Sequence, residues 1–235
     1  AVERVAVPAQ PVLLKMPETL GGLLKTRVAF LADYQDAAYA QQYEALVEEV
    51  RKAEASLGQG DKLARAVAKS LFKLMAYKDE YEVARLYTDG KFLEKLKQQF
   101  DGDLTLKFNL APPLLAKKDS KGHLVKAEYG SWMLKAFGLL ARFKGLRGTR
   151  LDVFGHTAER KMERQLIVEY CELVQSLLRG LTADKLPQAV ALASMAEKVR
   201  GFGHVKEAAV EVYRREVAAG LKAYAAGTAG LPHAA

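Results

Sequence analysis

Residues 199–210, VRGFGHVKEAAV, place two glycines and three basic side chains at the start of an expected helix. In such a turn the backbone N–H groups can form a concave nest that binds an anion, and basic side chains add positive charge. A lysine in the first turn of a helix is also unfavourable without an anion nearby. A tight turn between two packed helices, the favoured interpretation, needs the same glycines for their backbone freedom. The segment is therefore a candidate anion site or interdomain contact. Its members are Arg200, Gly201, Gly203, His204 and Lys206.

A second candidate is the polar stretch AYKDEYEVARLYTD, residues 76–89. Its Lys–Glu and Tyr–Arg pairs are four residues apart, which places ionic and aromatic groups on one face of a helix. That face is either solvated or an interface, and the interface interpretation draws on the preference of Tyr and Arg for protein contacts. The candidate interface residues are Tyr77, Lys78, Tyr81, Glu82 and Arg85.

Catalytic and metal-binding patterns are missing from the sequence. The four histidines are scattered, and none lies four residues from another as a helical metal site would require. The single cysteine, Cys171, falls within an expected helix, where it is typical of a packed thiol. One cysteine also excludes an internal disulfide and fits a reducing compartment. Neither a Gly-x-Ser-x-Gly elbow nor a phosphate-binding Gly-x-x-x-x-Gly-Lys loop occurs. We predict no catalytic residue and no metal site in this chain.

The elements that must position these residues are mostly helical. Apolar periodicity over residues 23–57 predicts a long amphipathic helix that is broken near Tyr39. A second helix is expected from Asp61, acting as its N-cap, towards residue 87. Further helices are expected over residues 90–100, 131–145, 157–180 and 182–200, and after residue 204.

One short region has the alternation of a strand. Leucines and a phenylalanine alternate with polar residues in LTLKFNL, residues 104–110, and residues 123–129 are the expected hairpin partner. The predicted fold class is mainly α: a multi-helix, bundle-like domain with a small β-hairpin insertion near 103–129. The expected organisation is a proline-rich linker or extended arm (1–20), a single helical accessory domain (21–226) and a flexible tail (227–235).

Net charge and hydropathy limit the classes of partner that the chain could bind. Lys and Arg number 36 against 28 Asp and Glu, a formal charge of +8 that favours polyanions or acidic partners. No run of 18 apolar residues and no leader peptide occurs, so we expect no membrane span and a cytoplasmic location. Basic residues and aromatic rings intermingle over residues 132–164, as in a nucleic-acid-binding module. Most of those rings fall at helical spacing and are expected to pack inside, so nucleic acid or another polyanion is the alternative partner.

Several blocks, taken together and in order, resemble the carboxy-terminal region of the fused indolepyruvate ferredoxin oxidoreductases. The resemblance extends from about residue 25 to residue 224. The blocks are LMAYKDEYEVARLYTD, FNLAPPLLAKKD, WMLKAFGLLARFKGLRGT, DVFGHTAERKMER and RGFGHVKEAA.

The resemblance implies membership of the 2-oxoacid:ferredoxin oxidoreductases, which decarboxylate aryl 2-oxoacids oxidatively and yield an acyl-coenzyme A. Their cofactors are thiamine diphosphate, Mg and iron–sulfur clusters, and their electron acceptor is ferredoxin. This chain lacks both a Gly-Asp-Gly motif for the thiamine cofactor and the cysteines for a cluster. We therefore expect an accessory domain that holds none of these cofactors and is not catalytic alone. It would pack against upstream catalytic domains of the same polypeptide, within an expected homo-oligomer of the parent enzyme.

Overall fold

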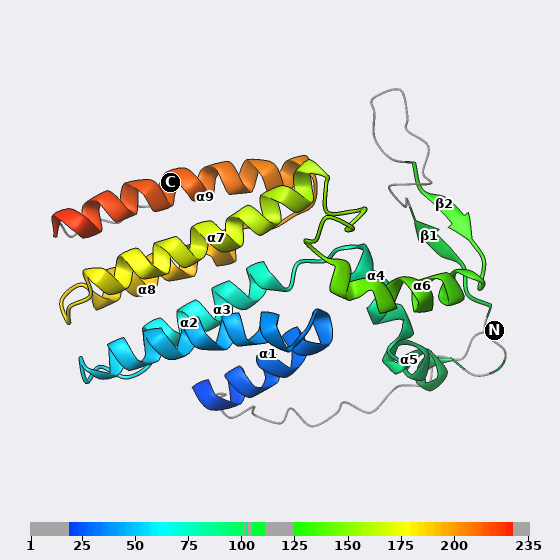
Figure 1. Ribbon diagram of the computed structural model, residues 1–235, viewed down its shortest axis with the longest axis horizontal. Helices are drawn as coiled ribbons and strands as arrows, with labels where there is room; N and C mark the ends of the chain where they lie inside the picture. Colours follow the sequence, from blue (N-terminus) through cyan, green and yellow to red (C-terminus); the bar gives the residue numbers. More distant parts are fainter. Residues whose placement is uncertain (1–18, 101, 103–104, 111–124, 228–235) are drawn as a thin grey trace, which may run out of the picture.

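The computed structural model describes residues 19–100, 102, 105–110 and 125–227 (Figure 1). Most of the predicted arm (1–20) and tail (227–235) lies outside the described residues. Within them, helices predominate and one two-stranded sheet is present, so the predicted fold class is confirmed. The helices are α1 (Leu20–Tyr34), α2 (Ala37–Ala55), α3 (Lys62–Met75), α4 (Glu80–Thr88), α5 (Lys91–Gln99), α6 (Met133–Arg142), α7 (Ala158–Arg179), α8 (Leu186–Ser194) and α9 (His204–Ala226), with short 3₁₀ turns η1 (Phe143–Leu146) and η2 (Met195–Lys198).

Six helices, α1, α2, α3, α7, α8 and α9, form the large lobe and share one apolar core (Figure 1). Helix α3 is central, because it contacts α1, α2, α7 and α8. Its buried residues include Leu63, Val67, Leu71 and Leu74, which recur every three or four positions, and alanines occupy much of the remainder. Small side chains let the neighbouring helices approach α3 from several directions. The buried residues of α3 thus follow the helical periodicity by which the sequence predicts amphipathic helices.

A small lobe consists of α4, α5, α6 and the hairpin of β1 (Phe108–Leu110) and β2 (Ala127–Tyr129). Its separate apolar core includes Phe108 and Phe137, and the ring of Tyr87 stacks on Phe137 with centroids 5.3 Å apart. The strands pair antiparallel, with Phe108 opposite Tyr129, as predicted. The observed strands are shorter than expected, and residues 103–104 and 111–124 lie outside the described part of the chain.

The predicted helix over residues 61–87 is wrong, because it divides into α3 and α4 around a linker, residues 76–79. The side chain of Asp79 accepts a hydrogen bond from the backbone N–H of Glu82 at 2.8 Å, and this cap starts a new helix. Asp61 forms no side-chain cap on α3. Glu54, from the end of α2, takes that role instead. The predicted break near Tyr39 is confirmed, with Asp36 capping α2 through the Tyr39 N–H.

Candidate functional site

The two lobes meet at a polar junction formed by Tyr34, Asp79 and Arg147, all buried. The Arg147 guanidinium donates to both Asp79 carboxylate oxygens, at 2.5 and 2.9 Å. It also donates to the Tyr34 carbonyl at 2.7 Å and lies 3.7 Å from the centre of the Tyr34 ring. Burial opposes the charge of Arg147, but the hydrogen bonds to Asp79, together with electrostatic interactions with Tyr34, Asp79 and Tyr77, outweigh it, so the pKa of Arg147 lies above its ordinary value. The junction is therefore a fixed ion pair that ties α1 to the start of α4.

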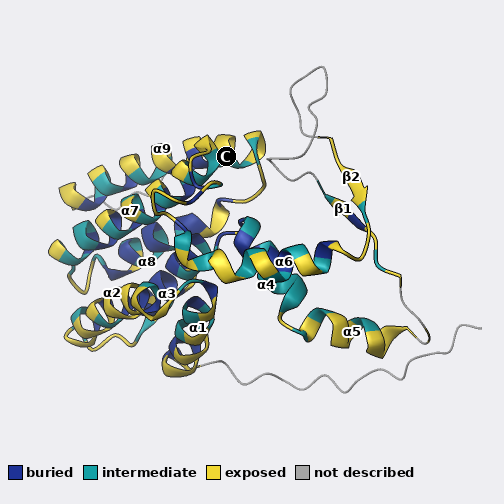
Figure 2. Cartoon of the chain, turned by 45° about the vertical axis from the view of Figure 1, so that its right-hand side comes forward, coloured by how far each residue is buried: buried dark blue, intermediate teal, exposed yellow. Residues whose placement is uncertain are grey.

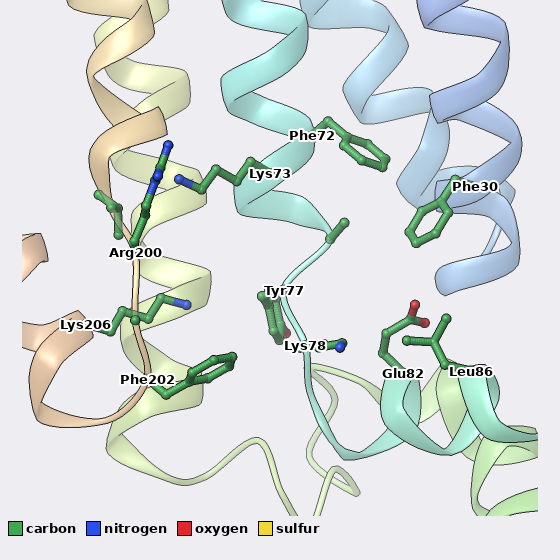
Figure 3. A pocket seen from close by; sticks show the side chains of 13 residues that line it. Phe30, Phe72, Lys73, Tyr77, Lys78, Glu82, Leu86, Arg200, Phe202 and Lys206 are labelled. Atoms are coloured by element: carbon green, nitrogen blue, oxygen red, sulfur yellow. The ribbon is translucent and has the colours of Figure 1, made fainter. Parts of the chain in front are cut away.

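An open cavity of about 570 Å³ lies beside this junction (Figure 3). We call it the basic cavity. It lies between the end of α3, the linker at residues 76–79 and the segment leading into α9. Both sequence-predicted groups contribute to it, although about 120 residues separate them in the chain. The contributing predicted residues are Tyr77, Lys78, Glu82, Arg200, Gly201 and Lys206, and the rings of Phe30, Phe72 and Phe202 also line the cavity.

Not every predicted residue lines the cavity. Tyr81 is buried inside the protein, and Tyr77 is also buried although it contributes to the cavity wall, so neither lies on a helix face open to solvent. The Tyr81 hydroxyl donates to Asp152 at 3.2 Å. Arg85 is engaged by Glu82 and does not line the cavity, and His204 is exposed outside it. Lys78 precedes α4, so the predicted pairing of Lys78 with Glu82 along one helix does not form.

The glycine turn before α9 has the backbone that its sequence predicted. Gly201 has a φ of +101° and Gly203 a φ of +54°, values that side-chain-bearing residues rarely adopt. The Gly203 N–H donates to a carboxylate oxygen of Glu159 at 3.3 Å. Lys206 forms an ion pair with Glu163. Glu159 and Glu163 therefore already occupy the N–H group of Gly203 and the ammonium group of Lys206 at this turn. Positive charge that a ligand could bind lies instead in the adjoining basic cavity.

Replacing Gly201 with alanine is expected to destabilise the chain by about 1–3 kcal/mol. An added Cβ would lie 2.7 Å from a methyl carbon of Val205, in addition to the strained φ. The free energy of unfolding in urea measures the effect. Gly145→Ala is the matched control, because its Cβ would meet nothing within 4 Å. Equal stability of the two variants would contradict the proposed strain.

Charge in the basic cavity is poorly neutralised. The Lys73 ammonium donates to the backbone carbonyls of Glu197, at 2.6 Å, and Ala196, at 3.4 Å, which fixes it beside Arg200. Burial lowers the pKa of Lys73, and the Arg200 guanidinium lowers it further. Among the described residues, neither Lys78 nor Arg200 has an ion-pair partner. Two cations thus face the cavity with no carboxylate bound to them.

Comparison with known proteins places the chain in a family. A family model described as a family of unknown function, DUF6537, matches residues 20–219. The chain belongs to this family. No curated protein and no solved structure gave a significant match. The residues matched to DUF6537 run from α1 into α9, so the matched part of this chain spans both lobes, the polar junction and the basic cavity.

Sequence reasoning missed several residues of this DUF6537 site. Lys73, Phe30 and Phe72 fit the pattern of amphipathic helices, and only their position at helix ends near a break distinguishes them.

Over the residues that the structure describes, no group of three or more His, Cys, Asp or Glu side chains could hold a metal ion. In the same part of the chain, no helix is both long enough and apolar enough to cross a membrane. The chemistry that the described site offers is recognition of a negatively charged group beside aromatic rings.

Proposed function

We propose that this chain is an accessory domain of a larger 2-oxoacid:ferredoxin oxidoreductase of the indolepyruvate type, and that it packs against catalytic domains without being catalytic alone. Thiamine diphosphate, Mg and iron–sulfur clusters would reside in those other domains. Ferredoxin would be the partner of the whole enzyme, a cytoplasmic homo-oligomer. The sequence resemblance supports this proposal. Two of its blocks contribute Asp79 and Arg147 to the polar junction, and RGFGHVKEAA contributes residues to the basic cavity.

The observation that carries the packing role is a stripe of exposed apolar side chains along α6. Trp132, Leu139 and Phe143 are 56%, 58% and 47% exposed. They are spaced seven and four residues apart, so they share one side of the helix. Figure 2 shows exposed turns along α6. Single exposed apolar residues are ordinary, but three large ones on the same side of α6 and its two ends favour a surface that another protein covers. Two further exposed apolar residues, Leu151 and Val153, follow in the next loop.

Charge beside the stripe indicates what could cover it. Lys135 and Arg142 are exposed on α6. They fall about 60–80° around the helix from the apolar stripe at 100° per residue. An apolar centre with a basic edge fits a partner surface with an apolar centre and an acidic edge. We therefore infer that α6 is the main contact with the rest of the enzyme.

The size of the native polypeptide and the protection of α6 test this proposal. An antiserum raised against the chain should detect in source-cell lysate a polypeptide several times longer than 235 residues. In that polypeptide, amide hydrogen exchange of α6 should slow at least about tenfold relative to the isolated chain, because burial suppresses local opening.

Helix α2 serves as the internal control, and its exchange should be the same in both samples. A native band at the length of this chain, or equal exchange of α6 in both samples, would refute the accessory-domain role. Slowed exchange in α6 that Leu139→Ser abolishes in the long polypeptide would assign the contact to the stripe.

A further inference from the structure

We propose that the basic cavity binds a small organic anion that combines an aromatic ring with a phosphate group, the chemistry of a nucleotide. The proposal concerns this chain alone and does not rest on the parent enzyme. It goes beyond the anion nest considered for the glycine turn, because the binding groups come from α1, α3, the linker and the turn together.

The dimensions of the cavity favour one small ligand. Its volume of about 570 Å³ lies within the range of ordinary small-molecule sites. A second hollow of about 600 Å³ adjoins it and shares Phe72, Lys73 and Arg200 with it. The second hollow adds Arg27, Lys69 and one carboxylate, Glu197, to the lining, so basic residues still outnumber acidic ones beyond the first hollow. A ligand with a charged end and a ring can therefore extend along the shared wall.

The charges favour a phosphate over a single carboxylate. Arg200 and Lys78 have no ion-pair partner among the described residues, and Lys73 is held beside Arg200 by backbone carbonyls. Glu82 does not neutralise them, because Arg85 donates to both of its oxygens at 2.8 Å. Lys73 and Arg200 lie together, and Lys78 lines another part of the same cavity, so the site matches a ligand with more than one negative charge and several acceptor oxygens. An anion at this point would also relieve the repulsion between Lys73 and Arg200.

The rings favour an aromatic body. Figure 3 shows the side chains of Arg200, Lys73 and Lys206 on one side and the rings of Phe30 and Phe72 on the other. Those two rings meet edge to face, with centroids 5.3 Å apart. Phe202 is 74% exposed and lines the cavity between two positive-φ glycines. A planar base can stack on such rings, which is a favourable and sequence-tolerant contact.

Calorimetric titration of the chain with adenosine diphosphate, pyrophosphate and adenosine tests the proposal at about 0.15 M ionic strength. Adenosine diphosphate should bind, pyrophosphate should bind more weakly, and adenosine should show no measurable binding. The double variant Lys78→Gln/Arg200→Gln should raise the Kd for adenosine diphosphate by about tenfold or more, because charge-assisted contacts are lost. Phe202→Ser should raise it by about fivefold and leave pyrophosphate binding unchanged.

Two controls remove the same charge or ring elsewhere. Lys52→Gln/Lys62→Gln changes the net charge equally, near the end of α2 and at the start of α3 and outside the cavity lining, and Phe100→Ser removes an exposed ring outside the cavity. Neither should change the Kd. The proposal is overturned if adenosine diphosphate does not bind, if both double variants weaken it equally, or if Phe202→Ser has no effect on it. Tighter binding of a single-stranded oligonucleotide than of adenosine diphosphate would also overturn it and assign the surface to nucleic acid.

Discussion

Replacing Arg147 with methionine should lower the free energy of unfolding by about 3–5 kcal/mol, because it leaves the buried Asp79 carboxylate without its partner. This loss of stability includes more than the ion pair with Asp79. Arg147 also donates to the Tyr34 carbonyl, which would remain buried without a donor. A typical domain is stable by only about 5–15 kcal/mol, so this variant should be close to unfolding at body temperature. Urea denaturation followed by circular dichroism measures the effect.

Arg51→Met is the matched control for this prediction. Arg51 forms a similar pair with Glu48 at 2.7 Å, but both side chains are accessible to solvent. Such pairs contribute about 0–1 kcal/mol, so the control should lose little stability. Removing both partners in Arg147→Met/Asp79→Leu should recover only part of the loss, because Asp79 also caps α4. If Arg147→Met and Arg51→Met were equally stable, the junction would have no special role.

Replacing Glu54 with alanine should cost about 3 kcal/mol, since two backbone N–H groups lose their only strong acceptor. The Glu54 side chain is fully buried and accepts from the N–H groups of Leu63 and Ala64, at 2.7 and 2.8 Å. A negative charge at this end of α3 also interacts favourably with the helix dipole. Thermal and urea unfolding measure the change.

Two further variants separate the cap from its charge. Glu54→Gln keeps one acceptor but loses the charge, so its stability should fall between that of the wild type and Glu54→Ala. Glu44→Ala removes an exposed carboxylate from the same helix and should change stability by less than about 0.5 kcal/mol. A loss in Glu44→Ala as large as that in Glu54→Ala would show that the general loss of a carboxylate from α2, and not capping of α3, is responsible.

Periodic apolar residues made most of the helices predictable. In α7, Leu166, Leu173 and Leu177 are buried as their spacing indicated, because repeated burial on one face leaves a repeated pattern. Single polar contacts leave no such pattern. Asp79 and Arg147 are 68 residues apart in the chain, and Glu54 caps a helix from a different element. The break after Met75 goes with the contacts of Asp79, which caps α4 and pairs with Arg147, and periodicity alone therefore predicted one continuous helix.

In the candidate site, too, the sequence predicted local features but not the contacts between distant segments. Local composition marked Lys78 and Arg200, since charges and glycines gather near them. It did not indicate that the two groups line one cavity, because their proximity depends on how α3 packs against the segment before α9. Lys73 was missed for a related reason: its ammonium acts through backbone carbonyls of η2, and backbone partners have no sequence signature.

The two apolar cores are separate clusters, and Arg147, paired with Asp79 at the start of α4, donates to the Tyr34 carbonyl in α1 of the large lobe. Such an arrangement divides the molecule into two cooperative units that can open at different free energies. The small lobe has the smaller core and should be the first to open. Its loss would release Glu82 and Leu86 from one wall of the basic cavity while α3 and the turn before α9 remain folded. Access to the cavity is thus coupled to the partial unfolding equilibrium of one lobe.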